Sequence, residues 1–182
     1  MKFTVYFFVK ALVLLISLSM SFYYDIREHK IKNFITIPAA LIGCLINFME
    51  KGLSGLSFSV EGWLTPVIFL ILFYYINVMG AGDIKLFAAI GAIMGLPFVI
   101  FSFTFTVCLG SIIGLALMIK RRALLFRMRI LLNYFLFSVA TRKLSPYVSK
   151  NDLSSKFAFS VAIIPGTCLQ LLLTILELKS VI

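Results

Sequence analysis

Two aspartates stand where long apolar runs of the sequence end or begin. Asp25 follows the run 3–24, and Asp83 follows Gly80-Ala81-Gly82 and precedes another apolar run. Two carboxyl groups that lie close together in a low-dielectric site cannot both ionise easily, so they share a proton over a wide pH range. The ionised member can take a proton from water while the protonated member polarises a scissile carbonyl group. Asp25 and Asp83 are therefore candidates for the catalytic pair of an aspartic peptidase.

The glycines before Asp83 suit such a site. Gly80 and Gly82 carry no side chain, so a substrate backbone can approach Asp83 closely. They also permit irregular backbone at membrane depth where that backbone lines a wet cavity. A structural role is the alternative: Asp83 caps the following helix, the glycines form the turn, and Asp25 pairs with a neighbouring basic residue. The sequence alone leaves both interpretations open.

The composition indicates a polytopic membrane protein with a single domain, residues 1–182. Of the 182 residues, 62% are hydrophobic and 13% are charged, and the mean hydropathy is +1.08. Soluble domains are about half apolar. The net charge is +10, but no basic stretch is interleaved with aromatic residues outside the apolar runs, which argues against nucleic acid as a partner.

Metal and cofactor sites are not indicated. Cys44, Cys108 and Cys168 lie far apart inside apolar runs, without a C-x-x-C pair, so neither a zinc site nor a disulfide framework is expected. His29 is the single histidine and lies among charged residues, as expected for a solvated loop. We expect no metal and no cofactor.

The apolar runs predict an all-α fold with about six transmembrane helices. A spanning helix needs roughly 20 apolar residues to cross a core of about 30 Å. Gly95-Leu96-Pro97 divides the long uncharged run 86–119, because proline begins a helix better than it continues one. The expected spans are 3–24, 34–49, 63–79, 84–96, 97–119 and 157–178, of which the fourth is short.

The basic residues predict the orientation of these spans. Of the 17 Lys and Arg residues, thirteen fall in the loops 25–33, 80–85 and 120–156, which six spans place on one side. Such loops face the cytoplasm, so we expect a multi-pass protein of the inner (cytoplasmic) membrane with Asp25 and Asp83 at its cytoplasmic edge. Residues 121–140 mix basic and apolar residues and predict an interfacial amphipathic helix on the anionic inner leaflet, or alternatively a partner-docking helix.

With these motifs the sequence resembles the type IV prepilin peptidases. Asp25 followed by IREHKIKN is similar to their D-x-x-x-x-x-I-P-N signature, with Lys32 at the proline position. GAGDIKLFAAIGAIMG closely resembles their G-x-G-D-x-K segment, and KFAFSVAIIPG is similar to a late element of the family. The resemblance covers most of residues 20–166.

The resemblance implies a G-x-G-D aspartic membrane endopeptidase that removes the short basic leader of prepilin or pseudopilin proteins at the cytoplasmic face. By position, Asp25 and Asp83 would be the catalytic pair. Gly80, Gly82, Lys85 and Asn33 would bind substrate or shape the site. For Lys85 three roles stay open: lowering the pKa of a nearby aspartate, holding a substrate carboxylate, or snorkelling at the interface.

The chain is similar to the short prepilin peptidases of tight-adherence (Flp) pilus systems. Longer members carry a cytoplasmic region for methylation, which the segment 25–33 between the first two spans is too short to provide, so no N-methyltransferase activity is expected. A small proton-coupled transporter or channel is the main alternative, since intramembrane carboxylates can relay protons. Neither repeat symmetry nor a midplane carboxylate supports it. A scaffold subunit without activity is a further alternative. The sequence does not indicate the oligomeric state.

Overall fold

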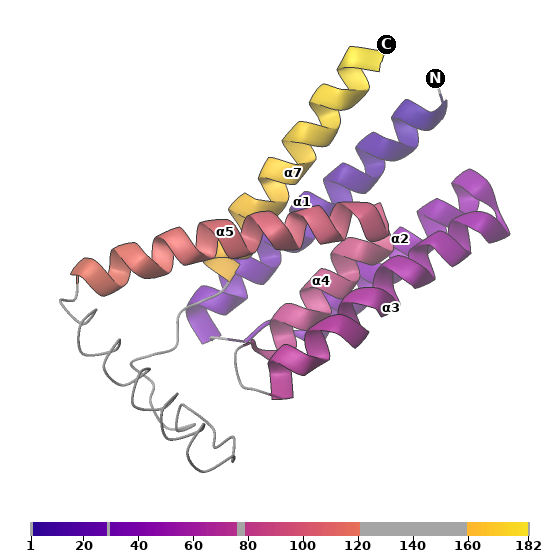
Figure 1. The fold of residues 1–182 in the computed structure, drawn as a ribbon. Helices are drawn as coiled ribbons and strands as arrows, with labels where there is room; N and C mark the ends of the chain where they lie inside the picture. Colours follow the sequence, from indigo (N-terminus) through magenta and orange to yellow (C-terminus); the bar gives the residue numbers. More distant parts are fainter. Residues whose placement is uncertain (1, 29, 76–78, 121–159, 182) are drawn as a thin grey trace, which may run out of the picture.

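The computed structural model describes residues 2–28, 30–75, 79–120 and 160–181, and within them it contains helices and no strands. The helices are α1 (Lys2–Glu28), α2 (Asn33–Lys51), α3 (Leu53–Tyr75), α4 (Ala81–Met94), α5 (Leu96–Lys120) and α7 (Ser160–Val181). This confirms the all-α prediction. The N-terminal end of α1 and the C-terminal end of α7 lie at the same end of the molecule (Figure 1).

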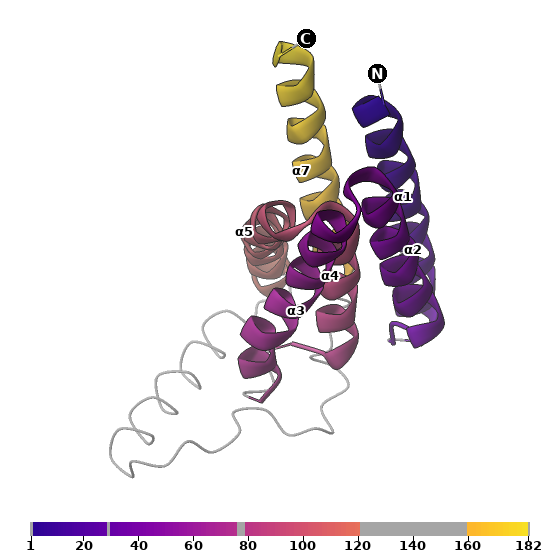
Figure 2. The ribbon, with the colours of Figure 1, turned by 90° about the vertical axis from the view of Figure 1, so that its right-hand side faces the viewer.

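The short helix α4 is the centre of the packing. It contacts α3, α2, α5 and α1, while α7 packs against α5 and α1. Figure 2 shows α1 and α2 side by side, with α5 and α7 on the far side of α4. From Leu86 to Ile93 every residue of α4 is buried, as expected for a helix that is apolar on all sides.

Glycines allow α3 and α4 to touch backbone to backbone. A Cβ atom added to Gly91 would lie 1.9 Å from the carbonyl oxygen of Gly62, and one added to Gly62 would lie 2.1 Å from that of Gly91. Close backbone approach through small residues is a common way to pack helices in membranes. Here it helps to bury α4 from Leu86 to Ile93.

Five of the described helices are long and apolar enough to cross a membrane, namely α1, α2, α3, α5 and α7. The fourth expected span is instead the 14-residue helix α4, which rises only about 21 Å at 1.5 Å per residue. Because its neighbours bury it, α4 does not have to reach across the lipid. The interfacial helix expected at 121–140 lies outside the described residues.

Two turns, at Gly52 between α2 and α3 and at Gly95 between α4 and α5, can be compared with the spans expected from the sequence. α3 begins at Leu53 and not at Trp63, because Gly52 adopts a φ of 65° and joins α2 to α3 directly. The backbone N–H of Gly52 donates to the carbonyl oxygen of Phe48, and α2 ends there. The predicted break at Gly95-Leu96-Pro97 is confirmed: Gly95 has a φ of 89° and separates α4 from α5.

Polar contacts hold the bundle together near these two turns. Asn47, which is 1% exposed, donates through its side-chain amide to Ser59 Oγ and to the carbonyl oxygens of Ala92 and Ile93. These carbonyl groups belong to the last turn of α4 and would otherwise lack partners. Lys10 of α1 forms an ion pair with Glu50 of α2.

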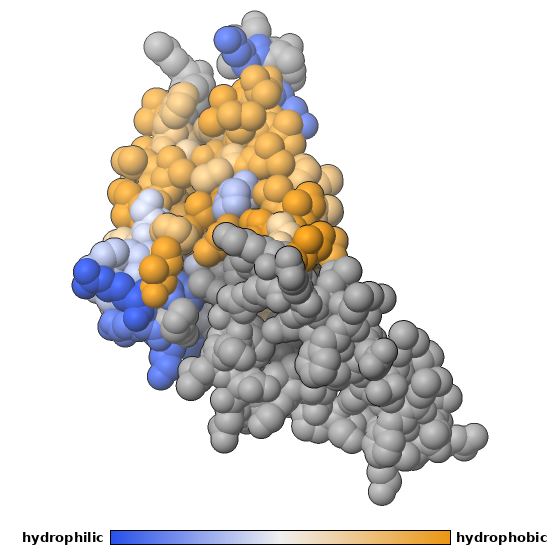
Figure 3. Space-filling view, turned by 90° about the vertical axis from the view of Figure 1, so that its left-hand side faces the viewer, coloured by the Kyte–Doolittle hydropathy of each residue, from blue (hydrophilic) through white to orange (hydrophobic). Residues whose placement is uncertain are grey.

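The surface of the described residues is largely apolar. Leucine, isoleucine and phenylalanine side chains of α1, α2, α3, α5 and α7 are exposed along the middle of the molecule. Figure 3 shows this apolar belt, with hydrophilic residues gathered toward its two ends. A surface of this kind is covered by lipid, which fits a multi-pass membrane protein.

Candidate active site

Asp25 lies in the last turn of α1 and is buried, with 7% of its surface exposed. Its Oδ2 atom accepts a hydrogen bond of 3.4 Å from the backbone N–H of Ser160, the first residue of α7. Residues far apart in the sequence therefore meet at this carboxyl group. The N-terminus of a helix favours negative charge, so α7 provides a suitable environment for a carboxylate at Asp25.

Asp83 lies in the first turn of α4 and is partly buried. The backbone N–H of Gly80, which precedes the helix, donates to Asp83 Oδ2 at 3.2 Å. Asp83 thus does cap the start of α4, although from the third helical position and not from the position before the helix. This hydrogen bond occupies only one of the four lone-pair sites of the Asp83 carboxyl group.

The charge of Asp25 acts on Asp83. The pKa of Asp83 is raised from 3.8 to about 7, first by burial and second by the negative charge of Asp25, while the Gly80 N–H lowers it. Asp83 precedes the buried run of α4 and lies outside the five spanning segments. The helices that carry them, α1 and α4, are in contact, and the charge of Asp25 is the second cause of the raised pKa of Asp83.

The glycines beside Asp83 have different neighbours. A Cβ atom added to Gly82 would lie 3.0 Å from Cβ of Ile31, so Gly82 lets the segment before α2 pack against α4. A Cβ atom added to Gly80 would lie 3.1 Å from Asp83 Oδ2. Gly82 thus serves close packing, whereas Gly80 keeps space free beside the carboxyl group.

Lys85 and Asn33 form a direct contact. Lys85 Nζ donates to Asn33 Oδ1 at 2.8 Å, and both side chains are exposed. None of the three roles left open for Lys85 included this contact. The hydrogen bond leaves the ammonium charge uncompensated, since Asn33 is neutral and is the hydrogen-bond partner found for Lys85 within the described part of the chain.

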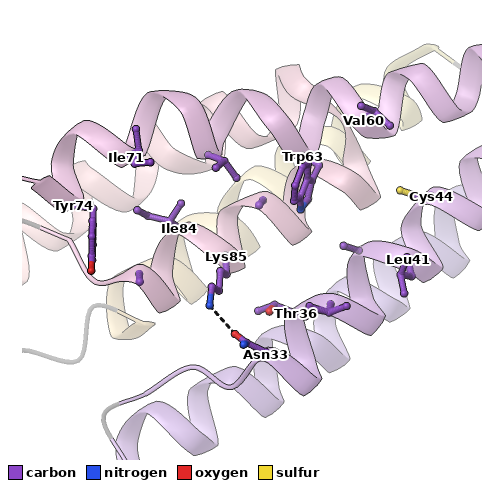
Figure 4. Close-up of a pocket in the computed structure, with 15 residues that line it drawn as sticks. Asn33, Thr36, Leu41, Cys44, Val60, Trp63, Ile71, Tyr74, Ile84 and Lys85 are labelled. Carbon is purple, nitrogen blue, oxygen red and sulfur yellow. Dashed lines mark hydrogen bonds between the residues drawn. The ribbon is translucent and has the colours of Figure 1, made fainter.

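An elongated groove runs along α2, α3 and α4 beside this contact (Figure 4). Its volume is about 700 Å³, and each of the three helices contributes one face to its lining. Asn33, Thr36 and Lys85 lie together at one end, Tyr74 of α3 adds a phenol group to the lining, and most of the remaining lining is apolar. Thr36 is 3% exposed and its hydroxyl group has no hydrogen-bond partner among the described residues.

The type IV leader peptidase family matches residues 12–115 of the chain. The chain belongs to this family. The matched segment contains α2, α3 and α4 entirely, together with Asp25 and Asp83. No curated protein and no solved structure matches the chain. As a family member the chain is a peptidase of the leader-peptidase type, and its several apolar helices make it a multi-pass membrane protein.

The structure gives a place at the site to two polar residues that were not among the expected site residues of this leader peptidase. Ser160 contacts Asp25, and its buried hydroxyl group has no partner among the described residues. Thr36 follows Asn33 by one helical turn, a spacing that puts both on one face of α2. That spacing was the available signal for Thr36. Ser160 lies in the late element KFAFSVAIIPG, but its contact with Asp25 arises only through tertiary packing.

Within the described residues, no group of three His, Cys, Asp or Glu side chains is arranged to hold a metal ion. Asp25 and Asp83 are two carboxylates that could bind a metal ion, but no third His, Cys, Asp or Glu side chain of the described residues joins them. Their arrangement suits a pair of carboxyl groups that exchange protons with water.

Proposed function

We propose that this leader peptidase is an aspartic endopeptidase that removes the short basic leader of prepilin or pseudopilin proteins at the cytoplasmic face of the inner membrane. The observation that carries the proposal is the electrostatic coupling of Asp83 to the buried Asp25. A carboxyl group with a pKa of about 7 beside a second carboxyl group suits general acid–base chemistry near neutral pH.

The proposed reaction divides two roles between the aspartates. Asp83 carries the proton, because its pKa is raised to about 7, and Asp25, which accepts the N–H of Ser160, is the carboxylate. Asp25 takes a proton from water, and the resulting oxygen attacks the scissile carbonyl carbon while Asp83 gives its proton to the carbonyl oxygen. The tetrahedral intermediate then collapses: Asp25 returns a proton to the leaving amide nitrogen, the C–N bond breaks, and Asp83 recovers its proton from the new carboxyl group.

The other parts of the proposal come from the sequence. The basic loops support a cytoplasmic position of the aspartates, on the side where a basic leader would lie. The short connection 29–32 between α1 and α2 supports a peptidase without methyltransferase activity, similar to the enzymes of Flp pilus systems. Two carboxyl groups and water supply the chemistry, so no cofactor is required.

The test is a cleavage assay in membranes. The chain is co-expressed with prepilins whose basic leader ends in glycine, and the loss of the leader is followed by immunoblot. Asp25→Asn and Asp83→Asn are each expected to lower the cleavage rate by about 10³-fold or more, since each role is essential. Glu61→Gln is the matched control, because Glu61 is an exposed carboxylate on α3.

All variants have to reach equal abundance in the membrane. Cleavage that persists in either Asn variant would reduce that aspartate to a capping or anchoring role. Proton flux through vesicles that depends on Asp83, with no cleavage of any prepilin by the unmodified chain, would favour the transporter alternative.

A further inference from the structure

The groove between α2, α3 and α4 is apolar along its length and polar at one end. Leu41 and Cys44 of α2 and Val60 and Trp63 of α3 line the apolar part. On α2 the groove extends from Asn33 to Cys44, which corresponds to about 16 Å of helix at 1.5 Å per residue. A groove of this length fits one face of an apolar helix of roughly three turns.

The polar end of the groove offers hydrogen-bond donors. Lys85 keeps N–H groups beyond the one that binds Asn33, the amide of Asn33 has its own N–H groups, and Thr36 has an unpartnered buried hydroxyl group. A buried hydroxyl group without a partner costs free energy. A ligand that brings hydrogen-bond acceptors to this end would satisfy Thr36 and meet the positive charge of Lys85.

We propose that this groove holds the apolar segment of the substrate that follows the scissile bond, with backbone carbonyl groups at the start of that segment at Asn33, Thr36 and Lys85. The proposal rests on the proposed function, because a prepilin-like substrate consists of a short leader followed by such a segment. It assigns the groove as the docking site for the part of the substrate that stays in the membrane.

The position of the groove relative to the aspartates supports this substrate. Ala81 and Lys85 line the groove, whereas Asp83 lies between them in sequence and couples to Asp25 on the side of α1. A chain that leaves the polar end of the groove therefore has to cross only the first turn of α4 to reach the carboxyl groups. Gly80 flanks that crossing and carries no side chain, whereas Gly82 is already packed against Ile31.

A lipid acyl chain is the competing occupant of an apolar groove in a membrane. The anionic headgroup of a phospholipid would also meet Asn33 and Lys85, so these two polar residues do not decide between the occupants. The continuity between groove and aspartates is the reason to choose the substrate.

Cysteine crosslinking tests the assignment, since Cys44 already lines the far end of the groove. Cys108 and Cys168 are replaced by alanine, and Asp83→Asn is added so that the substrate stays intact. Single cysteines are then placed at successive positions of the substrate's apolar segment, and disulfide formation is followed on non-reducing gels. The matched control moves the cysteine by one residue, as Cys44→Ala with Leu45→Cys, because Leu45 is 57% exposed on another face of α2.

We expect crosslinks to Cys44 at substrate positions about 11 residues beyond the scissile bond, repeating every three to four residues, and at least fivefold weaker crosslinks to the Leu45→Cys control.

Separately, Ala40→Trp, which fills the groove in the otherwise unmodified chain, is expected to raise KM by roughly tenfold, since burial of apolar side chains of the substrate is lost. Leu45→Trp is its control.

The outcomes separate this inference from the proposed function. Cleavage by the unmodified chain, with no preference for Cys44 over the control and no effect of Ala40→Trp, would overturn the docking site and leave the peptidase intact. Crosslinking to Cys44 without any cleavage by the unmodified chain would contradict the peptidase function and retain the binding site.

Discussion

Lys85 of α4 donates a hydrogen bond of 2.8 Å to Asn33 of α2, and this contact joins the two sequence motifs at one end of the bundle. Gly82 and Ile31 form a second contact between the same segments, where a Cβ atom added to Gly82 would lie 3.0 Å from Cβ of Ile31. The first turns of α2 and α4 thus form one unit. Asp83 is part of that unit and lies beside the last turn of α1, which carries Asp25.

The Lys85–Asn33 contact is expected to affect substrate binding more than folding. Lys85→Met or Asn33→Ala removes donors at the polar end of the groove, and we expect either change to raise KM about five- to tenfold with little change in kcat. Because both side chains are exposed, the stability should fall by about 1 kcal/mol or less.

Steady-state cleavage of a prepilin in detergent measures KM and kcat, and a thermal unfolding curve measures the stability. Lys179→Met is the control, since Lys179 is exposed near the opposite end of the molecule. An unchanged KM in both variants would exclude these side chains from substrate binding.

The cleavage rate is expected to depend on the proton of Asp83. The pKa of Asp83 is about 7, and the proposed reaction needs the protonated form. Hence kcat/KM should fall as the pH rises through about 7, approaching tenfold per pH unit on the alkaline side. A pH profile of kcat/KM in liposomes measures this. A rate that stays constant up to pH 9 would contradict the role of Asp83 as proton donor.

The same pKa shift predicts a change of stability with pH. The folded chain holds the proton of Asp83 more tightly than the unfolded chain, whose carboxyl group titrates near 3.8. The stabilisation from protonated Asp83 is fully present below pH 3.8 and is lost as the pH rises through about 7. Melting temperatures at pH 6 and pH 8 should differ more in the unmodified chain than in Asp83→Asn.

Ser160 is expected to act on Asp25 through its backbone N–H. Ser160→Pro removes this N–H, and proline is tolerated at the first position of a helix, so the helix should persist. We expect kcat to fall about tenfold, because a hydrogen bond to a charged group contributes about 1.5–3 kcal/mol. Ser160→Ala keeps the N–H and removes only the unpartnered hydroxyl group, so its kcat should change less than twofold. Equal losses in the two variants would show that the N–H is not the group that matters.

The crossing of α3 and α4 should be sensitive to a single methyl group. In Gly91→Ala the new Cβ would lie 1.9 Å from the carbonyl oxygen of Gly62, so the helices have to move apart. We expect a loss of about 1–3 kcal/mol or more. Gly114→Ala on α5 meets nothing within 4 Å and should be neutral or stabilising by about 0.5–1 kcal/mol. Thermal unfolding in detergent compares the two, and equal melting temperatures would contradict the backbone contact.

The sequence by itself determined the class of the protein and several of its local features. Apolar runs predicted membrane helices, because hydropathy is a property of each segment alone. The break at Gly95-Leu96-Pro97 also followed from local chemistry, since glycine permits a positive φ and proline starts a helix. Asp25 and Asp83 stood out because a charge next to an apolar run is costly unless it has a function.

Local hydropathy was a poorer guide to where helices begin. The sequence placed the third span at Trp63, whereas α3 begins at Leu53. The residues before Trp63 are less apolar, but a helix can continue beyond the part that lipid covers, because its backbone hydrogen bonds do not depend on lipid. The hydropathy of a segment reports its depth in the membrane and not the extent of its helix.

Only the tertiary structure decided how these elements meet. α4 is too short to span the membrane alone, and its burial depends on Gly62 and Gly91, which are on different helices. The coupling of Asp25 to Asp83, the N–H of Ser160 at Asp25 and the groove beside Lys85 likewise join residues from separate helices. No local pattern encodes such contacts, because they arise only when several helices pack around one buried helix and exclude both water and lipid.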